Sequence, residues 1–479
     1  MPKKILFFCY VALTTWLALH HEPWRDEADS WLMARDASVA QILRIGPDSG
    51  HPPLWYFMLK PFTVSGLPYA TQPALHLSII WAAAWLLVFR SPFPWVVSAS
   101  VLFTYFFSFE YSIIARNYAS GILGIFLYCS ASDGPTSGRK RRAKTLSMFI
   151  MSLASLFTLI SAAILLLTEF QRWSWRRTNN SATKLPRYLW LMMIPVLIGV
   201  ITLWPSGNGQ FSGLIFKRVM IQAPIDSLSR SMMPLRDFQF LYAAICATWL
   251  LFVSIVIFRC QWHAALFLSM SCLSLFTLFA SVHYLPNAPR YGGMVFIFAI
   301  AAIWLATAGA GQENTTRLTH RHTAWALLAL FSLAQLPDAI SAWSKETIFP
   351  YTDAGTVAGQ LTAAGGTKKL VACSPPTSCE SVLLRMPASL KFLYPGIGFG
   401  THGFWDKQHL LASMMSSEQA VAWTKNFIHQ NLPGHDGFIF MSQSALLNPE
   451  SHGLKELFFS TARAWAVRDE TFHIYSTVR

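Results

Sequence analysis

The sequence predicts a polytopic α-helical membrane protein with about eleven transmembrane helices, followed by a C-terminal extracytoplasmic α/β domain. Of the 479 residues, 53% are hydrophobic and only 13% are charged, whereas about a quarter of the residues of a soluble protein are charged. Apolar stretches long enough to cross a bilayer recur through the first 340 residues. Beyond them Gly, Ser, Thr and charged residues return, which indicates a domain outside the membrane.

The basic residues indicate a membrane orientation. The formal net charge is +14, but the Lys and Arg residues lie in short segments between apolar runs, as the positive-inside rule predicts for cytoplasmic loops. We therefore expect membrane lipid, and no nucleic acid, as their partner. The chain begins with Lys3-Lys4 and an apolar run from Ile5 to Leu19 that has no small-residue cleavage site. This run is predicted to remain as an anchor.

Nine apolar stretches are each predicted to cross the bilayer once: residues 5–20, 73–89, 93–109, 112–130, 188–204, 240–258, 263–282, 291–309 and 323–340. A further stretch, 146–170, lies between two basic clusters, at 139–144 and 172–187. If both clusters are cytoplasmic, it must enter and return as two short helices that turn near residues 158–161. The chain then crosses eleven times, with its N-terminus inside and its C-terminus outside. As a single span it would place the tail in the cytoplasm; the charge bias favours the hairpin.

Residues 1–340 are thus predicted to form the membrane domain and residues 341–479 the extracytoplasmic domain. In the tail the pattern predicts a helix near 353–364, a strand at 369–373, a helix opened by the capping box Ser416-Ser417-Glu418-Gln419, and strands at 437–441 and 471–478. Cys373 and Cys379 lie close together in this polar region. They are expected to form a disulfide if the domain is extracytoplasmic.

The first outer loop, residues 21–72, holds the most distinctive polar residues. Four acids, Glu22, Asp26, Glu27 and Asp29, fall within eight residues directly after a predicted span, and three of them lie between Trp24 and Trp31, in a chain with only 23 acids. Tryptophan favours the headgroup region, so Asp26, Glu27 and Asp29 are expected at the boundary between lipid and water. A carboxylate there can act as a general base or hold a metal on a phosphate. Alternatively, these acids only favour the N-terminus of an interfacial helix.

Four motifs follow one another in this part of the chain: Asp26-Glu27, His51-Pro52-Pro53-Leu54-Trp55-Tyr56, Glu110-Tyr111 and Ala115-Arg116-Asn117-Tyr118. In this order and spacing they resemble the motifs of the GT-C superfamily, and more closely the family-39 and RgtA/B/C/D-like glycosyltransferases. These are relatives of protein O-mannosyltransferases and of the lipid A aminoarabinose transferase. The motifs cover about the first 130 residues. The rest is similar only in its plan of many helices followed by an extracytoplasmic α/β domain.

The resemblance implies an enzyme of the plasma or inner membrane. It would move a sugar, with inversion, from a polyprenyl-phosphate donor to a lipid, glycan or protein acceptor at the outer face. Asp26 matches the catalytic base, which takes the proton of the acceptor hydroxyl, and Glu27 matches a neighbour that shapes the site.

Other positions of the motifs are expected to line the pocket. Glu110 falls where the family often has a second acid, and Tyr118 belongs to the motif that opens the fourth helix. His51 stands where several relatives carry Lys, and Gly50 stands where some carry an acidic metal ligand. We therefore predict no bound metal and no cofactor.

A cation near the donor phosphate would stabilise the charge that develops on the leaving group. The candidates are Arg116, Lys217, Arg218 and Arg290. Arg116 and Arg290 lie at the outer ends of predicted spans, where snorkelling toward water is the alternative. Lys217 and Arg218, in the second outer loop, fit a solvated pair equally well. His283 is a further pocket candidate, although an interfacial histidine is more often only hydrogen-bonded.

Two other classes of function compete with this interpretation. A transporter or flippase of lipid-linked sugars would need ionisable residues near the bilayer midplane and interrupted helices related by internal symmetry. The predicted spans are mostly free of charge and the acids gather in a loop, which favours the enzyme. A non-catalytic protein of envelope assembly would instead tolerate the loss of Asp26.

Overall fold

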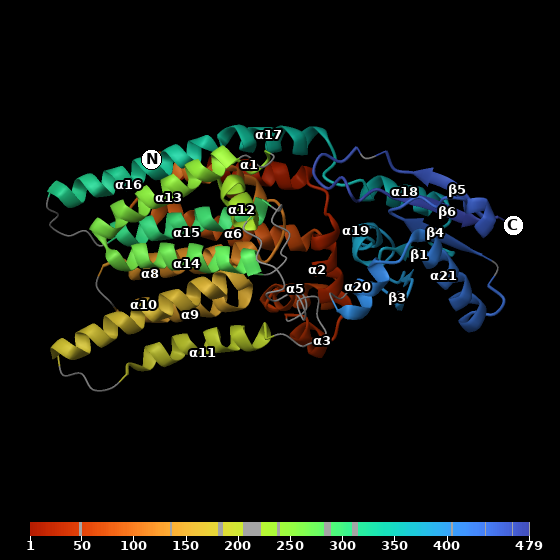
Figure 1. Cartoon of the computed structure of the whole chain (residues 1–479), viewed down its shortest axis with the longest axis horizontal. Helices are drawn as coiled ribbons and strands as arrows, with labels where there is room; N and C mark the ends of the chain where they lie inside the picture. The colour runs from red at the N-terminus through yellow and green to blue at the C-terminus, as the bar shows by residue number, and fades with distance from the viewer. Residues whose placement is uncertain are drawn as a thin grey trace.

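The computed structural model describes residues 1–46, 50–134, 137–180, 185–204, 222–236, 240–281, 289–308, 315–403, 406–435, 437–461 and 463–478. These residues form a bundle of helices and, beside it, a domain with a six-stranded sheet (Figure 1). Seven of the described helices are long and apolar enough to cross a membrane. The chain is therefore an integral membrane protein of mostly helical fold with a C-terminal α/β domain, as the composition predicts.

The bundle contains α1 (Pro2–His20), α6 (Thr71–Phe89), α7 (Trp95–Leu102), α8 (Tyr118–Ser132), α9 (Gly138–Ala154), α10 (Leu156–Asn180), α11 (Arg187–Thr202), α13 (Phe240–Cys260), α14 (Trp262–Ser281), α15 (Pro289–Thr307), α16 (Thr315–Ala334) and α17 (Leu336–Ile348). Every predicted span overlaps one or two of these helices. Some of these helices are shorter than predicted: α8 has 15 residues and α11 has 16. A full crossing needs about 20 residues. We call the end that packs against the sheet domain the domain end, and the opposite end the far end.

Residues 146–170 form a helical hairpin. α9 ends at Ala154 and α10 begins at Leu156. Lys144, near the start of α9, has its Nζ 2.6 Å from Oε1 of Glu169, in the second half of α10. α10 therefore runs back along α9 toward the far end. The turn lies at Ser155, slightly before the predicted position, because the Ser155 hydroxyl accepts a hydrogen bond from the Thr158 amide (3.2 Å) and so caps α10.

The sheet domain contains β1 (Leu370–Ser374), β2 (Phe392–Tyr394), β3 (Gly398–Gly400), β4 (Phe438–Ser442), β5 (Leu454–Phe459) and β6 (His473–Thr477). The strand order is β3-β2-β1-β4-β6-β5, with β1 parallel to β2 and β4 and the other pairs antiparallel. Alternation along β1 sends Val371 toward α18 (Ala354–Ala363) and Ala372 toward α21 (Ser417–Asn431). Both faces of the sheet are therefore buried. Cys373 and Cys379 form the predicted disulfide.

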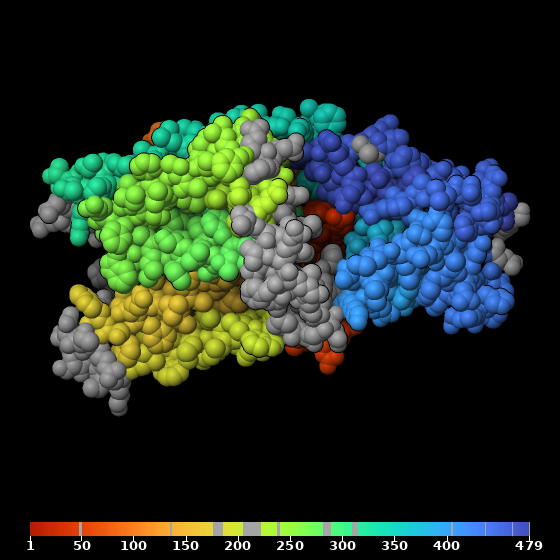
Figure 2. Space-filling view, in the orientation of Figure 1, coloured from red at the N-terminus to blue at the C-terminus, as the bar shows by residue number. Residues whose placement is uncertain are grey.

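Helix α2 (Arg25–Asp36) joins the two parts. Trp24, directly before the helix, and Trp31, within it, pack into the core of the bundle. Leu32 packs into the core of the sheet domain with Val357 and Ile439. Figure 2 shows this red segment between the green helices and the blue domain. The acids of the first loop therefore lie at the junction between the two parts.

Candidate functional site

The first turn of α2 presents Asp26 and Glu27 in different directions, because successive residues of an α-helix are about 100° apart around its axis. Trp24 has an extended backbone, and Glu27 Oε2 accepts a hydrogen bond from its amide at 3.4 Å. Acids in this turn also interact favourably with the helix dipole. The local sequence thus starts the helix and separates the roles of the two carboxylates.

Glu27 is fully buried and its carboxylate has several partners. Oε1 accepts a hydrogen bond from the Ala115 amide at 2.6 Å, and Oε2 lies 2.8 Å from His21 Nε2. The other ring nitrogen of His21 lies 2.7 Å from Glu346 Oε1, and Glu346 accepts a hydrogen bond from Trp465 Nε1 at 3.0 Å. Glu27 therefore positions the residues around it.

The chain between Glu110 and Tyr118 is not α-helical, which brings Arg116 to the site. It follows the π-helical turn Phe106–Glu110 and precedes α8. Irregular backbone next to a membrane needs internal hydrogen-bond partners. Gln72 donates to the Ala115 carbonyl at 3.4 Å, and His76 Nε2 lies 3.0 Å from the Tyr111 carbonyl.

Asp26 forms an ion-paired cluster with two arginines from distant parts of the chain. Its Oδ2 accepts a hydrogen bond from Arg116 Nη1 and lies 3.4 Å from Arg290 Nη2. Tyr111 holds the start of α15 by donating to the Arg290 carbonyl at 2.6 Å. A Cβ at Gly293 would lie 2.5 Å from that hydroxyl, so glycine permits the close approach. The side chains of Asp26, Arg116 and Arg290 are 17%, 11% and 17% exposed, so water still reaches them.

Three predicted pocket residues lie around this cluster. His51 Nε2 lies 3.3 Å from Arg116 Nη2. Tyr118 packs edge-on against the His51 ring, with centroids 6.0 Å apart. Glu110 is buried and accepts a hydrogen bond from Tyr105 at 2.7 Å. Sequence reasoning therefore identified residues that the fold brings together.

Several hydrogen-bond donors of the cluster are buried and, among the described residues, have no partner. They are Arg290 Nε, Tyr118 Oη and Trp24 Nε1. The Arg290 guanidinium lies 5.4 Å from the Trp24 ring centroid. Buried donors are rarely left without an acceptor. A ligand that carries several acceptor oxygens would satisfy them.

The pKa shifts outside the membrane-spanning segments follow from this charge distribution. Burial would raise the pKa of Asp26, but Arg116, Arg290 and Arg25 outweigh it and lower that pKa. Burial, together with the charges of Arg116 and Arg290, lowers the pKa of His51 to about 3. His51 is therefore neutral, and two guanidinium groups face one carboxylate. The three ion-paired side chains, Asp26, Arg116 and Arg290, together carry one net positive charge, which suits an anion.

Three candidates, Lys217, Arg218 and His283, lie outside the described residues. Sequence reasoning assigned no role to His21 or Glu346, although the spacing of His21 and Glu27 around the start of α2 was a usable signal. Within the described ranges no three His, Cys, Asp or Glu side chains are grouped in a way that could hold a metal ion.

His21 predicts a pH-dependent stability. Burial opposes its charge, but Glu27 and Glu346 outweigh burial and raise the pKa of His21 from 6.5 to about 10. A pKa raised in the folded state gives stability that is complete below pH 6.5 and is lost as pH rises toward 10. We expect the free energy of unfolding in detergent to fall between pH 7 and 10, by up to ~1.4 kcal/mol per pH unit, and the unfolding temperature to fall with it. A His21→Gln variant should show a flatter pH dependence; an unchanged slope would contradict this role.

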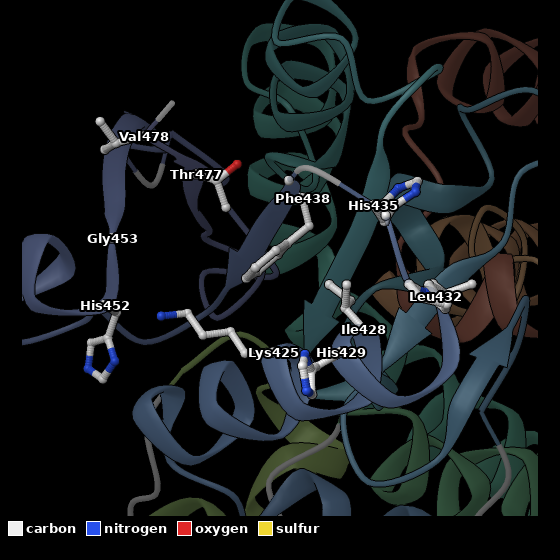
Figure 3. A pocket seen from close by; sticks show the side chains of 13 residues that line it. Lys425, Ile428, His429, Leu432, His435, Phe438, His452, Gly453, Thr477 and Val478 are labelled. Carbon is white, nitrogen blue, oxygen red and sulfur yellow. The ribbon is translucent and has the colours of Figure 1, made fainter.

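A cavity of about 600 Å³ lies in the sheet domain next to Lys425, His429, His452 and Phe438 (Figure 3). Phe438 lies at the amino end of β4. Helix α19 (Glu380–Leu383), which contacts α2 from the sheet domain, follows the carboxyl end of β1. Because β1 and β4 are parallel, this cavity lies at the edge of the sheet away from the cluster of Asp26. It is therefore separate from the candidate site.

Comparison with protein families gives no match to any family model, and no curated protein matches the chain.

Proposed function

We propose that this protein is a GT-C-type membrane glycosyltransferase. It transfers a sugar from a polyprenyl-phosphate donor to a lipid, glycan or protein acceptor of the cell envelope, at the predicted outer face of the membrane. The observation that supports it most directly is the largely buried but water-accessible cluster in which Asp26 is paired with Arg116 and Arg290. A carboxylate that could act as a base and two cations lie together at the junction between the bundle and the sheet domain, an arrangement that suits transfer from a lipid phosphate.

In the proposed reaction the acceptor hydroxyl attacks the anomeric carbon while the bond from that carbon to the phosphate oxygen breaks. Asp26 takes the hydroxyl proton, and polyprenyl phosphate leaves with the bonding electrons. Arg116 and Arg290 stabilise the negative charge that develops on the leaving phosphate. Attack opposite the leaving group inverts the anomeric configuration.

The test is a transfer assay with purified full-length protein, a radiolabelled polyprenyl-phosphate hexose or pentose, and envelope extract as acceptor. We expect label to move from the donor to the extract. We expect Arg290→Ala to lower kcat/KM by about 10²-fold, because one of the two cations is lost, and Arg290→Lys to lower it less. Arg236→Ala is the matched control, since Arg236 pairs with Asp338 and not with Asp26.

A transporter would give a different result. If none of the donors is consumed, while proteoliposomes that contain the protein move the lipid-linked sugar across the bilayer, the enzymatic proposal is wrong. Equal activity of the Arg290→Ala and Arg236→Ala variants would remove Arg290 from the donor site.

A further inference from the structure

A large cavity lies at the far end of the bundle, between the ends of α9, α10, α11 and α14. Its volume is about 1050 Å³. Its wall includes the charged or polar residues Arg141, Lys144, Glu169, Arg172, Gln261 and His263. This cavity is separated from the candidate site by the length of the helices and plays no part in the proposed transfer.

The cavity has an excess of positive charge. Lys144 Nζ lies 2.6 Å from Glu169 Oε1, and Arg172 Nη1 lies 3.6 Å from the same oxygen. A single carboxylate thus faces two cations. The Arg141 guanidinium lies 5.3 Å from the Tyr188 ring centroid, and no acid of the described residues forms an ion pair with Arg141. His263 Nδ1 is buried and has no hydrogen-bond partner among the described residues.

An apolar groove of about 580 Å³ adjoins this cavity. The two share Arg141, Pro186 and Tyr188. The groove continues along α9 and α11, where it is lined by Leu146, Phe149 and Leu191, and these side chains are 53%, 44% and 44% exposed. A basic, partly enclosed cavity therefore opens directly onto an apolar surface of the membrane-spanning helices.

We propose that this composite site binds a phospholipid with an anionic phosphate headgroup, in the leaflet at the far end of the bundle. The phosphate lies in the basic cavity near Arg141, and an acyl chain lies in the groove against Leu191. Basic segments next to a membrane attract anionic lipid in general. An exposed basic segment would offer only charge, whereas this site joins a partly enclosed basic cavity to an apolar groove. One amphipathic ligand would occupy both parts.

The test is native mass spectrometry of the delipidated full-length protein in detergent, titrated with dioleoyl phosphatidic acid, with dioleoyl phosphatidylcholine and with inorganic phosphate. Wild-type protein should bind phosphatidic acid at least about fivefold more tightly than phosphatidylcholine. Arg141→Ala should weaken phosphatidic acid binding about fivefold. Arg259→Ala is the matched control, because Arg259 lies in the last turn of α13 and outside the cavity.

A second pair of variants tests the groove independently of charge. Leu191→Trp should fill the groove and weaken lipid binding, whereas Ile194→Trp, at a 50% exposed position of the same helix outside the groove, should not. Equal affinity for the two lipids, or equal behaviour of Leu191→Trp and Ile194→Trp, would overturn the proposal. If inorganic phosphate displaced phosphatidic acid when present at the same concentration as the lipid, the ligand would be free phosphate and not a lipid.

Discussion

Replacing Asp26 by Asn is expected to lower kcat for sugar transfer by about 10²- to 10⁴-fold. The amide has nearly the same shape as the carboxylate but cannot take the acceptor proton. Donor binding should persist or become tighter, because Arg116 and Arg290 no longer share their charge with a carboxylate. Steady-state rates of label transfer, measured over a range of donor concentrations, give kcat and KM.

Asp36→Asn is the matched control for this variant. Asp36 is the last residue of the same helix and pairs with Arg35, so its loss should leave kcat unchanged. Asp36→Asn should unfold close to the wild-type temperature, whereas Asp26→Asn should unfold at a lower one and is assayed below it, because Arg116 and Arg290 lose their carboxylate partner. Wild-type kcat in a folded Asp26→Asn protein would remove Asp26 from the catalytic step.

The same base predicts a difference between two pH profiles. In the free protein Arg116, Arg290 and Arg25 lower the pKa of Asp26 against the effect of burial. A bound donor phosphate would share Arg116 and Arg290, so the pKa of Asp26 should rise in the complex. Activity needs the deprotonated carboxylate and therefore falls as pH falls through this pKa. We expect the acid limb of kcat to lie at higher pH than that of kcat/KM.

Glu27→Ala is expected to destabilise the fold by about 3–5 kcal/mol. The variant leaves the Ala115 amide without its acceptor and leaves His21, whose pKa is raised to about 10, with one carboxylate partner in place of two. A buried charge that loses a partner costs much more than a surface pair. Chemical or thermal unfolding in detergent measures the loss.

Glu27→Gln separates charge from shape in this prediction. Its amide oxygen can still accept a hydrogen bond from Ala115, so the loss should be clearly smaller than for Ala. Arg25→Ala removes a partly exposed pair with Asp469 next to Glu27 and should cost at most about 1 kcal/mol. If Glu27→Ala unfolds like the Arg25→Ala variant, the buried network is not a main source of stability.

Much of the fold was predictable because hydrophobic length and local capping determine it. The apolar runs predicted the bundle helices, the two basic clusters predicted the hairpin, and the capping box at Ser416 correctly marked the start of α21. The short strands β2 and β3, of three residues each, were missed, since so few residues show no alternation. β5 was missed because its pattern mixes exposed charged and apolar residues.

The site was predictable only in part, because it depends on contacts between distant segments. Residue type and position at the ends of predicted spans were enough to select Asp26, Arg116 and Arg290. The pairing of Asp26 with Arg290, 264 residues apart, depends on the packing of α15 against Tyr111. The partnership of His21 with Glu346 spans 325 residues. No local pattern contains that information.

The position of Leu32 in the core of the sheet domain has a consequence for the architecture of the chain. The helix that carries the proposed base is a shared component, since the sheet domain also binds it through the bond of 2.8 Å from the Arg25 amide to Glu470 and that of 3.2 Å from Arg385 to the Pro23 carbonyl. Neither half is thus an interchangeable module. A chimera that exchanged the C-terminal half for an unrelated one would lose transfer, although every residue proposed to touch the sugar donor or its phosphate would still be present.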